Sequence, residues 1–309
     1  MVDINEVAEN IYMIDDQLYS IPKLGSTYLL NEEKKALIDS GPATSAIVVL
    51  DGIKKVGVRP EDIDYIVVTH IHLDHAGGAG VLIRDMPKAR VVVHYKGSRH
   101  LVSPARLVSS VIKVHGKEAM GRDGEVVPIE LSRVRPVYEG DVIKLSERQI
   151  LRFIDAPGHA PHELCIYESR NNGLFVGDSV GMHVAGDDEV LLPITPPPDF
   201  DLELYINTLE RLTELNSTAI YFGHFGVSNK VRENLQLAID KVKAWDDIVV
   251  KVMKEEGFDG VEERMIAQGY AELATIRETE PIYKHLTEVI MPLNAAGYIK
   301  YYQKKYEAG

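Results

Sequence analysis

The 309-residue sequence predicts an α/β protein that ends in an all-helical segment. Short apolar runs rich in Val, Ile, Tyr and Phe, bounded by Gly, Pro, Asn or Asp, recur through the first two-thirds and are typical of strands. Between them lie segments whose leucines follow a helical spacing. After about residue 228 the strand signals stop and a 3.6-residue period takes over. We therefore predict a domain over residues 1–228 and a helical extension over residues 229–309.

The predicted elements of the first domain follow from these patterns. Strands are expected at Ser26–Leu30, Lys35–Ile38, Ile63–Thr69, Arg90–His94, Leu151–Asp155, Leu164–Tyr167, Leu174–Val176 and Ala219–Phe222. Helices are expected at Thr44–Val56 and Leu202–Leu215. Strands that alternate with helices in this way are characteristic of α/β folds.

The extension is expected to contain three helices. Apolar residues at helical spacing predict the first over residues 231–252, and a weaker pattern predicts the second over residues 261–276. Pro281 occupies a favourable first position for the third, which Pro292 should kink or break. The tyrosines of the last stretch, from Tyr298 to Tyr306, are expected to pack in a core or a dimer contact, since such stripes usually do.

Composition excludes several classes of protein. A single cysteine, Cys165, rules out an intrachain disulfide. The net charge of −13 disfavours broad nucleic-acid binding. No apolar run approaches the ~20 residues of a membrane span, and the first residues lack the apolar core of a signal peptide. We expect a cytoplasmic protein that acts on a small molecule, with neither nucleic acid nor membrane as a partner, and a homodimer as an open option.

The segment His70-Ile71-His72-Leu73-Asp74-His75 carries the clearest chemical signal. It follows a strand-like run and precedes a glycine-rich turn, so it should lie on a loop at the end of a strand. In extended backbone His70, His72 and Asp74 would share one face, while Ile71 and Leu73 would point inward. Imidazoles and a carboxylate at this spacing suit a borderline metal such as zinc.

Three further candidate ligands repeat a single pattern. His159, Asp178 and His224 each follow a glycine at the end of a predicted strand, where backbone can approach a crowded centre closely. Together with the segment 70–75, they offer enough donors for two metal ions.

These motifs resemble, in composition and order, those of the metallo-β-lactamase superfamily, over about residues 1–228. The resemblance implies a four-layer αβ/βα sandwich, with the metal site at one edge between two sheets. It also implies that His70, His72 and His159 bind one metal, that Asp74, His75 and His224 bind a second, and that Asp178 bridges them. Asp39 matches a family position that orients a ligand, a common role next to metal sites.

The resemblance also narrows the activity. True β-lactamases usually place a cysteine where this chain has Asp178, so antibiotic hydrolysis is not expected. We expect instead a hydrolase that cleaves an ester, thioester or lactone with water held by two divalent ions, zinc before iron or manganese. Asp74 and Asp178 are the expected catalytic residues. His183, Thr195 and Tyr221 are candidates for substrate contact.

Two other functions remain open from the sequence. The same scaffold in persulfide dioxygenases holds one iron, and the residues of this chain do not exclude that chemistry. A metal-binding protein without turnover is the third possibility.

Overall fold

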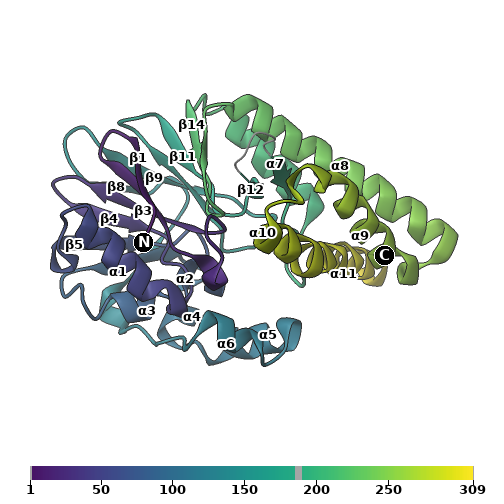
Figure 1. Cartoon of the computed structure of the whole chain (residues 1–309), viewed down its shortest axis with the longest axis horizontal. Helices are drawn as coiled ribbons and strands as arrows, with labels where there is room; N and C mark the ends of the chain where they lie inside the picture. Colours follow the sequence, from purple (N-terminus) through teal and green to yellow (C-terminus); the bar gives the residue numbers. More distant parts are fainter. Residues whose placement is uncertain (1, 185–189, 309) are drawn as a thin grey trace. The chain divides into compact units, whose positions relative to one another are not determined.

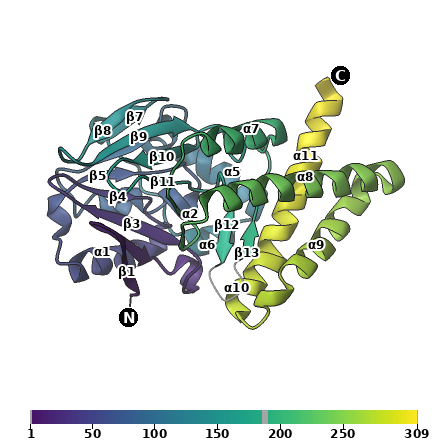
Figure 2. The ribbon, with the colours of Figure 1, turned by 90° about the horizontal axis from the view of Figure 1, so that it is seen from above.

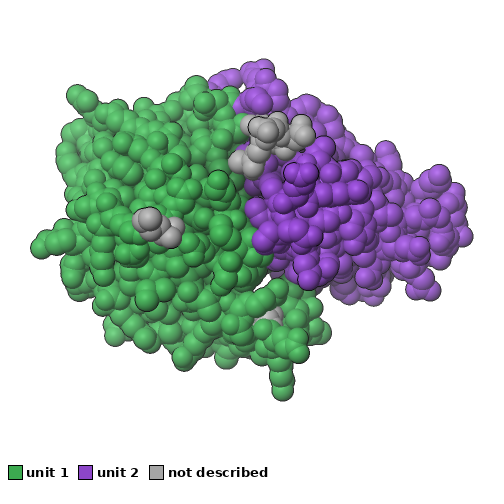
Figure 3. All heavy atoms as spheres, in the orientation of Figure 1, with its two compact units in different colours: residues 1–155, 162–177, 217–229 green, residues 156–161, 178–216, 230–309 purple. Residues whose placement is uncertain are grey.

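The computed structural model of the chain describes residues 2–184 and 190–308. Its contacts divide the chain into two compact units, coloured separately in Figure 3. The first comprises residues 1–155, 162–177 and 217–229, and the second comprises residues 156–161, 178–216 and 230–309. One of the boundaries between the units falls at residue 229. However, residues 178–216 group with the C-terminal helices, because a hairpin and a helix from this stretch pack against them.

The first unit contains a seven-stranded mixed sheet (Figure 1). Its strands lie in sequence order, antiparallel from β1 to β4 and parallel from β4 to β7. They are β1 (Ile4–Ala8), β2 (Ile11–Asp15), β3 (Ser26–Asn31), β4 (Lys35–Ile38), β5 (Ile63–Val67), β6 (Arg90–His94) and β7 (Val134–Val137).

A six-stranded sheet completes the strand layers of this unit. Its order is β15-β14-β11-β10-β9-β8, in which only the β11–β14 pair is parallel. The strands are β8 (Val142–Lys144), β9 (Ile150–Asp155), β10 (Leu164–Glu168), β11 (Gly173–Phe175), β14 (Ala219–Tyr221) and β15 (Val227–Ser228). Every strand predicted from the sequence is present, and no end is shifted by more than two residues.

The parallel strands of the first sheet are buried on both faces. On β6, Val91 and Val93 join the cluster that packs under the helices, whereas Val92 joins the cluster shared with the second sheet. On β4, Leu37 and Ile38 divide in the same way. Because side chains alternate along a strand, continuous apolar runs here serve two cores at once.

Short helices accompany the first sheet. They are α1 (Ala46–Lys55), α2 (Leu73–Ala76), α3 (Ala79–Leu82), α4 (Ser98–Val102), α5 (Ala105–His115) and α6 (Ala119–Asp123) (Figure 1). The 3₁₀ turns are η1 (Leu18–Ser20), η2 (Ala43–Ser45), η3 (Pro60–Asp62) and η4 (Leu131–Arg133). The helix α1 corresponds to the one predicted at Thr44–Val56, whereas α5 and α6 were not predicted, although α5 has an amphipathic pattern.

The second unit is mainly helical (Figure 2). It holds the hairpin β12 (Met182–Val184)–β13 (Val190–Leu192) and the helices α7 (Leu202–Thr213), α8 (Val231–Glu256), α9 (Val261–Glu272), α10 (Glu280–His285) and α11 (Met291–Ala308). The turns η5 (Phe258–Gly260) and η6 (Ala274–Ile276) and a π-helical turn, η7 (Leu286–Ile290), connect them. The second predicted helix therefore ends at Glu272 and is followed by η6.

The C-terminal tyrosines mostly pack inside the second unit, as predicted. Tyr298 is fully buried and donates a hydrogen bond from its hydroxyl to the carbonyl oxygen of Val242 on α8 (2.7 Å). Its ring also contacts Phe200. The helix is not broken at Pro292, because the π-helical turn η7 runs directly into α11, whose first turn contains this proline.

Within residues 2–184 and 190–308, the structure contains no helix with the length and apolar character that a membrane crossing needs.

Candidate metal centre

The HxHxDH segment starts extended and becomes helical halfway. His72 has an extended backbone (φ −61°, ψ 149°) and caps α2, which begins at Leu73. Bonds from Ala76 N–H to the His72 carbonyl and from Gly77 N–H to the Leu73 carbonyl, both 2.9 Å, close the helical turn. The prediction that extended backbone carries Asp74 to the same face as the first two histidines was therefore wrong.

The helical turn instead places Asp74 beside His75 and His224. These three side chains each offer one ligand atom, and the three atoms lie within 4.8 Å of one another. Oδ2 of Asp74 is 3.9 Å from Nε2 of His75 and 3.7 Å from Nε2 of His224. Both imidazoles are buried, whereas the Asp74 side chain is 23% exposed. In this cluster the carboxylate of Asp74 is therefore accessible, whereas the two imidazole nitrogens beside it are buried.

The orientation of both imidazoles is fixed from behind. Nδ1 of His75 donates to Oδ2 of Asp39 (3.0 Å), and Nδ1 of His224 donates to the carbonyl oxygen of Leu24 (3.2 Å). Each ring therefore directs Nε2 toward Asp74. Such support of the far nitrogen is the usual way in which proteins orient metal-binding histidines.

His70 and His72 form a second pair in the same unit. Nε2 of His70 lies 3.0 Å from Nδ1 of His72. Oγ1 of Thr69 is 3.0 Å from both oxygens of Asp39, to which its hydroxyl donates, and it accepts from Nδ1 of His70 (3.1 Å). Asp39 therefore supports His75 directly and His70 through Thr69.

His159 and Asp178 come together within the second unit. Nε2 of His159 is 3.4 Å from Oδ2 of Asp178, and both side chains are almost fully buried. Nδ1 of His159 donates to the carbonyl oxygen of Ile194 (2.9 Å), so its ring is oriented in the same manner as those of the first unit.

The donors fit a divalent metal. Bonds of about 2.0–2.2 Å at tetrahedral angles place neighbouring ligand atoms roughly 3.3 Å apart. The His70–His72 and His159–Asp178 separations, 3.0 and 3.4 Å, lie near this value, and those within the Asp74 cluster are slightly longer. Imidazole and carboxylate donors match the chemistry of zinc, iron and manganese sites, and the far nitrogens of four of the imidazoles are already engaged: those of His70, His75, His159 and His224.

Two of the glycines noted in the sequence make room for this arrangement. A Cβ atom on Gly223 would lie 2.8 Å from Cε1 of His75. On Gly177, which has φ +50°, it would lie 2.8 Å from Oγ1 of Thr69 and 2.9 Å from Oε1 of Glu163. Both glycines therefore permit the close approach of backbone that we predicted.

The three candidates for substrate contact lie in packed surroundings. Thr195 is fully buried and holds α11, since its backbone N–H and hydroxyl donate to Oδ1 of Asn294 (2.7 and 3.2 Å). Tyr221 packs in the core between the two sheets, and its hydroxyl end lies against Gly173. These positions argue against substrate contact by either residue. His183 is buried on β12, where its backbone pairs with Leu191.

Sequence reasoning did not identify several residues near the cluster. Burial raises the pKa of Asp16 to about 7; Asp15 raises it further, while His224 and His75 oppose the shift. Buried Glu163 lies 4.0 Å from Nδ1 of His70. Neither carboxylate belongs to a motif; Asp16 follows a second acidic residue, Asp15, and Glu163 follows His162.

A second group of overlooked residues comes from η1, α5 and α6. The Asp74 carboxylate contributes to the electrostatic environment of Tyr19, Asp123 and His115. The turn η1 and the five-residue helix α6 carry no periodic pattern, whereas the amphipathic pattern of α5, which ends at His115, was a signal that the sequence did offer.

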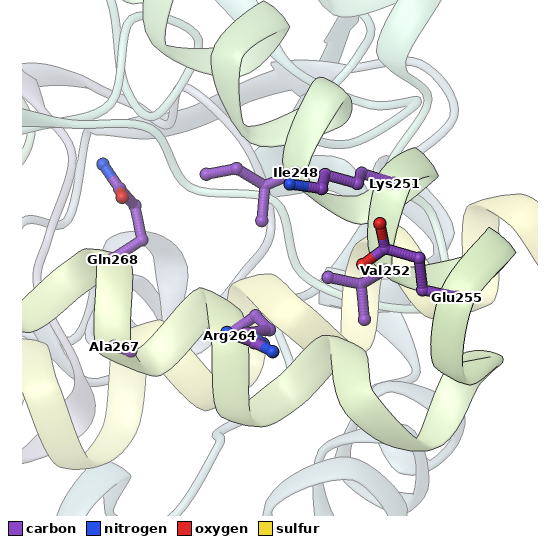
Figure 4. Close-up of a pocket in the computed structure, with 7 residues that line it drawn as sticks. All are labelled: Ile248, Lys251, Val252, Glu255, Arg264, Ala267 and Gln268. Atoms are coloured by element: carbon purple, nitrogen blue, oxygen red, sulfur yellow. The ribbon is translucent and has the colours of Figure 1, made fainter.

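A surface pocket of about 370 Å³ lies between α8 and α9 of the second unit (Figure 4). Charged residues of both signs contribute to its wall, and Arg264 already pairs with Glu256 (3.1 Å). Its lining consists of Ile248, Lys251, Val252, Glu255, Arg264, Ala267 and Gln268. The lining offers a single carboxylate and no histidine, so this pocket is not a metal-binding site.

Comparison with known proteins agrees with the geometry. Residues 21–224 match the profile of the metallo-beta-lactamase superfamily. A metallo-beta-lactamase fold-containing protein of Sulfurisphaera tokodaii is 30% identical over 216 residues, which are 69% of this chain and 77% of that protein.

Relatives with named activities are more distant. An N-acyl homoserine lactonase of a Bacillus species is 27% identical over 182 residues, covering 57% of this chain and 61% of the lactonase. An atrochrysone carboxyl ACP thioesterase of Aspergillus fumigatus is 25% identical over 219 residues, covering 70% of this chain and 55% of the thioesterase. This chain is therefore similar to hydrolases of two kinds.

A solved structure extends the likeness to nearly the whole chain. A metallo-beta-lactamase family protein of Thermus thermophilus has a TM-score of 0.68 and 19% identity, covering 97% of this chain and 95% of that protein. The fold, including helices after the second sheet, is thus one already seen in this family. The chain belongs to the metallo-β-lactamase superfamily.

Proposed function

We propose that the chain is a metal-dependent hydrolase that cleaves an ester, thioester or lactone bond in a small molecule. The observation that carries the proposal is the Asp74–His75–His224 cluster, in which two oriented imidazoles face a partly exposed carboxylate. Family membership and similarity to a lactonase and a thioesterase support it.

The ligand set completes the proposal. His70, His72 and His159 would hold one divalent ion, Asp74, His75 and His224 a second, and Asp178 would bridge the two. Such ions, when bound, would lower the pKa of a coordinated water toward ~7 and polarise the carbonyl group, whose carbon the water attacks.

Asp74 is the residue best placed to handle a proton. Its side chain is 23% exposed, whereas the imidazoles beside it are 3% and 4% exposed, so Asp74 is the accessible member of the cluster. It would orient the attacking water and return a proton to the leaving oxygen or sulfur, as a general acid–base group does. Both buried imidazoles would keep their protons on Nδ1 throughout. His75 would donate its proton to Asp39, and His224 would donate its proton to the Leu24 carbonyl.

A substrate panel tests the proposal. Protein purified with its native metals, or loaded with zinc or manganese, should hydrolyse at least one of a set of aryl esters, acyl thioesters and γ-lactones. Asp178→Ala and Asp74→Ala should each lower kcat/KM by at least about a hundredfold, since each removes a ligand or proton carrier. Asp51→Ala is the matched control, because Asp51 is an exposed residue of α1 that pairs with Lys55.

Other outcomes separate the remaining functions. Oxygen consumption with glutathione persulfide, without ester, thioester or lactone hydrolysis, would replace the proposal with a dioxygenase. If metal-loaded protein turns over neither the ester, thioester and lactone panel nor glutathione persulfide, the remaining function is metal binding without catalysis.

A further inference from the structure

The side chain of Arg122, at the end of α6, lies on the ring of Tyr19 from η1. The guanidinium carbon is 4.8 Å from the centre of the ring, within the range of a cation–π contact. Arg122 is half-buried, and no described carboxylate forms an ion pair with it. A planar group with five N–H donors is thus fixed in place with donors to spare.

This pair is held rigidly on the framework that carries the metal ligands. The hydroxyl of Thr44 donates to the carbonyl oxygen of Arg122 (2.7 Å), which fixes the end of α6 to η2. Ser40 lies just before η2, and its backbone N–H donates a hydrogen bond to the carbonyl oxygen of His75 (2.8 Å). Arg122 and His75 are therefore linked through a few short contacts.

Tyr19 is itself held in a costly conformation. Its backbone lies in the left-handed region (φ 54°, ψ 27°), as do those of Gln17 and Ser20. This conformation is unfavourable for a bulky residue, and such strain occurs often at functional sites. Its hydroxyl hydrogen-bonds to buried Asp123, so the ring presents a fixed face to Arg122.

Tyr19, Asp123 and His115 lie close enough to Asp74 for its charge to act on each of them. The negative charge of Asp74 raises the pKa of both Tyr19 and Asp123, in each case after burial, the larger cause. It also opposes the lowering of the pKa of His115 by burial. Asp123 is 4% exposed, so its carboxylate is enclosed, whereas Arg122 is half-buried and His115 is exposed.

We propose that Arg122, braced by Tyr19, binds a carboxylate group of the substrate. The inference rests on the proposed hydrolase function and narrows it to esters or lactones that carry a carboxylate near the scissile bond. A guanidinium group can donate two parallel hydrogen bonds to a carboxylate, and this charge-assisted pairing raises the affinity. A neutral substrate cannot form it. Tyr19 is a positioning residue, because it acts through Arg122.

Two matched lactones test the proposal, with zinc-loaded protein throughout. Wild type should hydrolyse 5-oxotetrahydrofuran-2-carboxylate with a kcat/KM at least about tenfold above that of γ-butyrolactone, through KM. Arg122→Gln should abolish this preference, and Arg122→Lys should restore part of it. Arg106→Gln, on α5, removes the same charge from the neighbouring helix and should keep the preference. Equal zinc content in all variants would show that the metal ligands are unchanged.

A binding measurement separates this proposal from the hydrolase itself. Calorimetry compares 3-oxocyclopentane-1-carboxylate with cyclopentanone, which have no bond to hydrolyse. If wild type binds 3-oxocyclopentane-1-carboxylate more tightly than cyclopentanone and Arg122→Gln loses this preference, the inference is supported. This holds even if neither lactone is cleaved. In that case only the hydrolase proposal loses support. A wild type without preference, or a preference that survives in Arg122→Gln, overturns it.

Discussion

Oδ2 of Asp39 lies 3.0 Å from Nδ1 of His75 and receives its hydrogen bond. The same carboxylate accepts from the backbone N–H of Thr69 (2.7 Å), so it ties α2 to the end of β5. Asp39 itself has a left-handed backbone (φ 60°), a conformation that aspartate tolerates better than most residues. One buried carboxylate therefore sets both the path of the loop and the orientation of a ligand.

Replacing Asp39 by Asn should weaken metal binding. The amide cannot accept from His75 and from both donors of Thr69 at once, so the imidazole loses its fixed orientation. We expect the affinity of the weaker-bound zinc to fall by about 10–100-fold, as measured by competition with a chromophoric chelator. Asp51→Asn should leave the titration unchanged. An unaltered affinity in Asp39→Asn would show that the hydrogen bond does not orient the ligand.

Gly223→Ala should disturb the same ligand from the other side. The new Cβ atom would lie 2.8 Å from Cε1 of His75, closer than carbon atoms pack, so the ring must move. Metal content measured after dialysis should drop. The control is Gly121→Ala, since a Cβ atom there meets no atom within 4 Å. Full metal retention by Gly223→Ala would contradict the packing described around His75.

Asp16 should make the metal-free protein less stable as the pH rises. Its folded pKa of about 7, against an ordinary value of 3.8, means that the folded state binds the proton more tightly. Stability should therefore fall from about pH 4 to about pH 7, by up to roughly 4 kcal/mol from this group. Urea denaturation should show Asp16→Asn gaining stability relative to wild type across this range. A constant difference between the two proteins would refute the assignment.

Thr195→Val should affect stability and leave catalysis unchanged. The substitution keeps the shape of the side chain and removes the hydroxyl that binds Asn294, at a cost of about 1 kcal/mol. Thermal unfolding should report the loss, while the KM of any substrate found in the panel should stay the same. A changed KM with unchanged stability would return Thr195 to the list of substrate contacts.

The sequence predicted the strands and most of the ligand-bearing turns because these depend on local signals. Apolar runs gave β5, β6 and β14, and the glycines before Asp178 and His224 marked where backbone must approach closely. These signals depend on a few residues that are neighbours in the sequence, so they can be recognised without knowledge of the fold.

Other features depend on contacts between distant parts of the chain. The helical turn of α2 is stabilised by Ser40, 35 residues before His75, so an extended loop was the natural but wrong expectation. Thr195 and Tyr221 followed strand-like or loop signals, but their roles are set by Asn294 and by the opposite sheet. The Tyr19–Arg122 contact joins two loops without any pattern, and only the folded chain brings them together.

Metal quantification on natively purified protein tests the proposed centre most directly. Two divalent ions per chain are expected for wild type, and about one for His224→Ala, which removes a nitrogen from the Asp74 cluster while leaving His70 and His72 intact. A single iron per chain in wild type, unchanged by the loss of His224, would contradict the two-metal hydrolase.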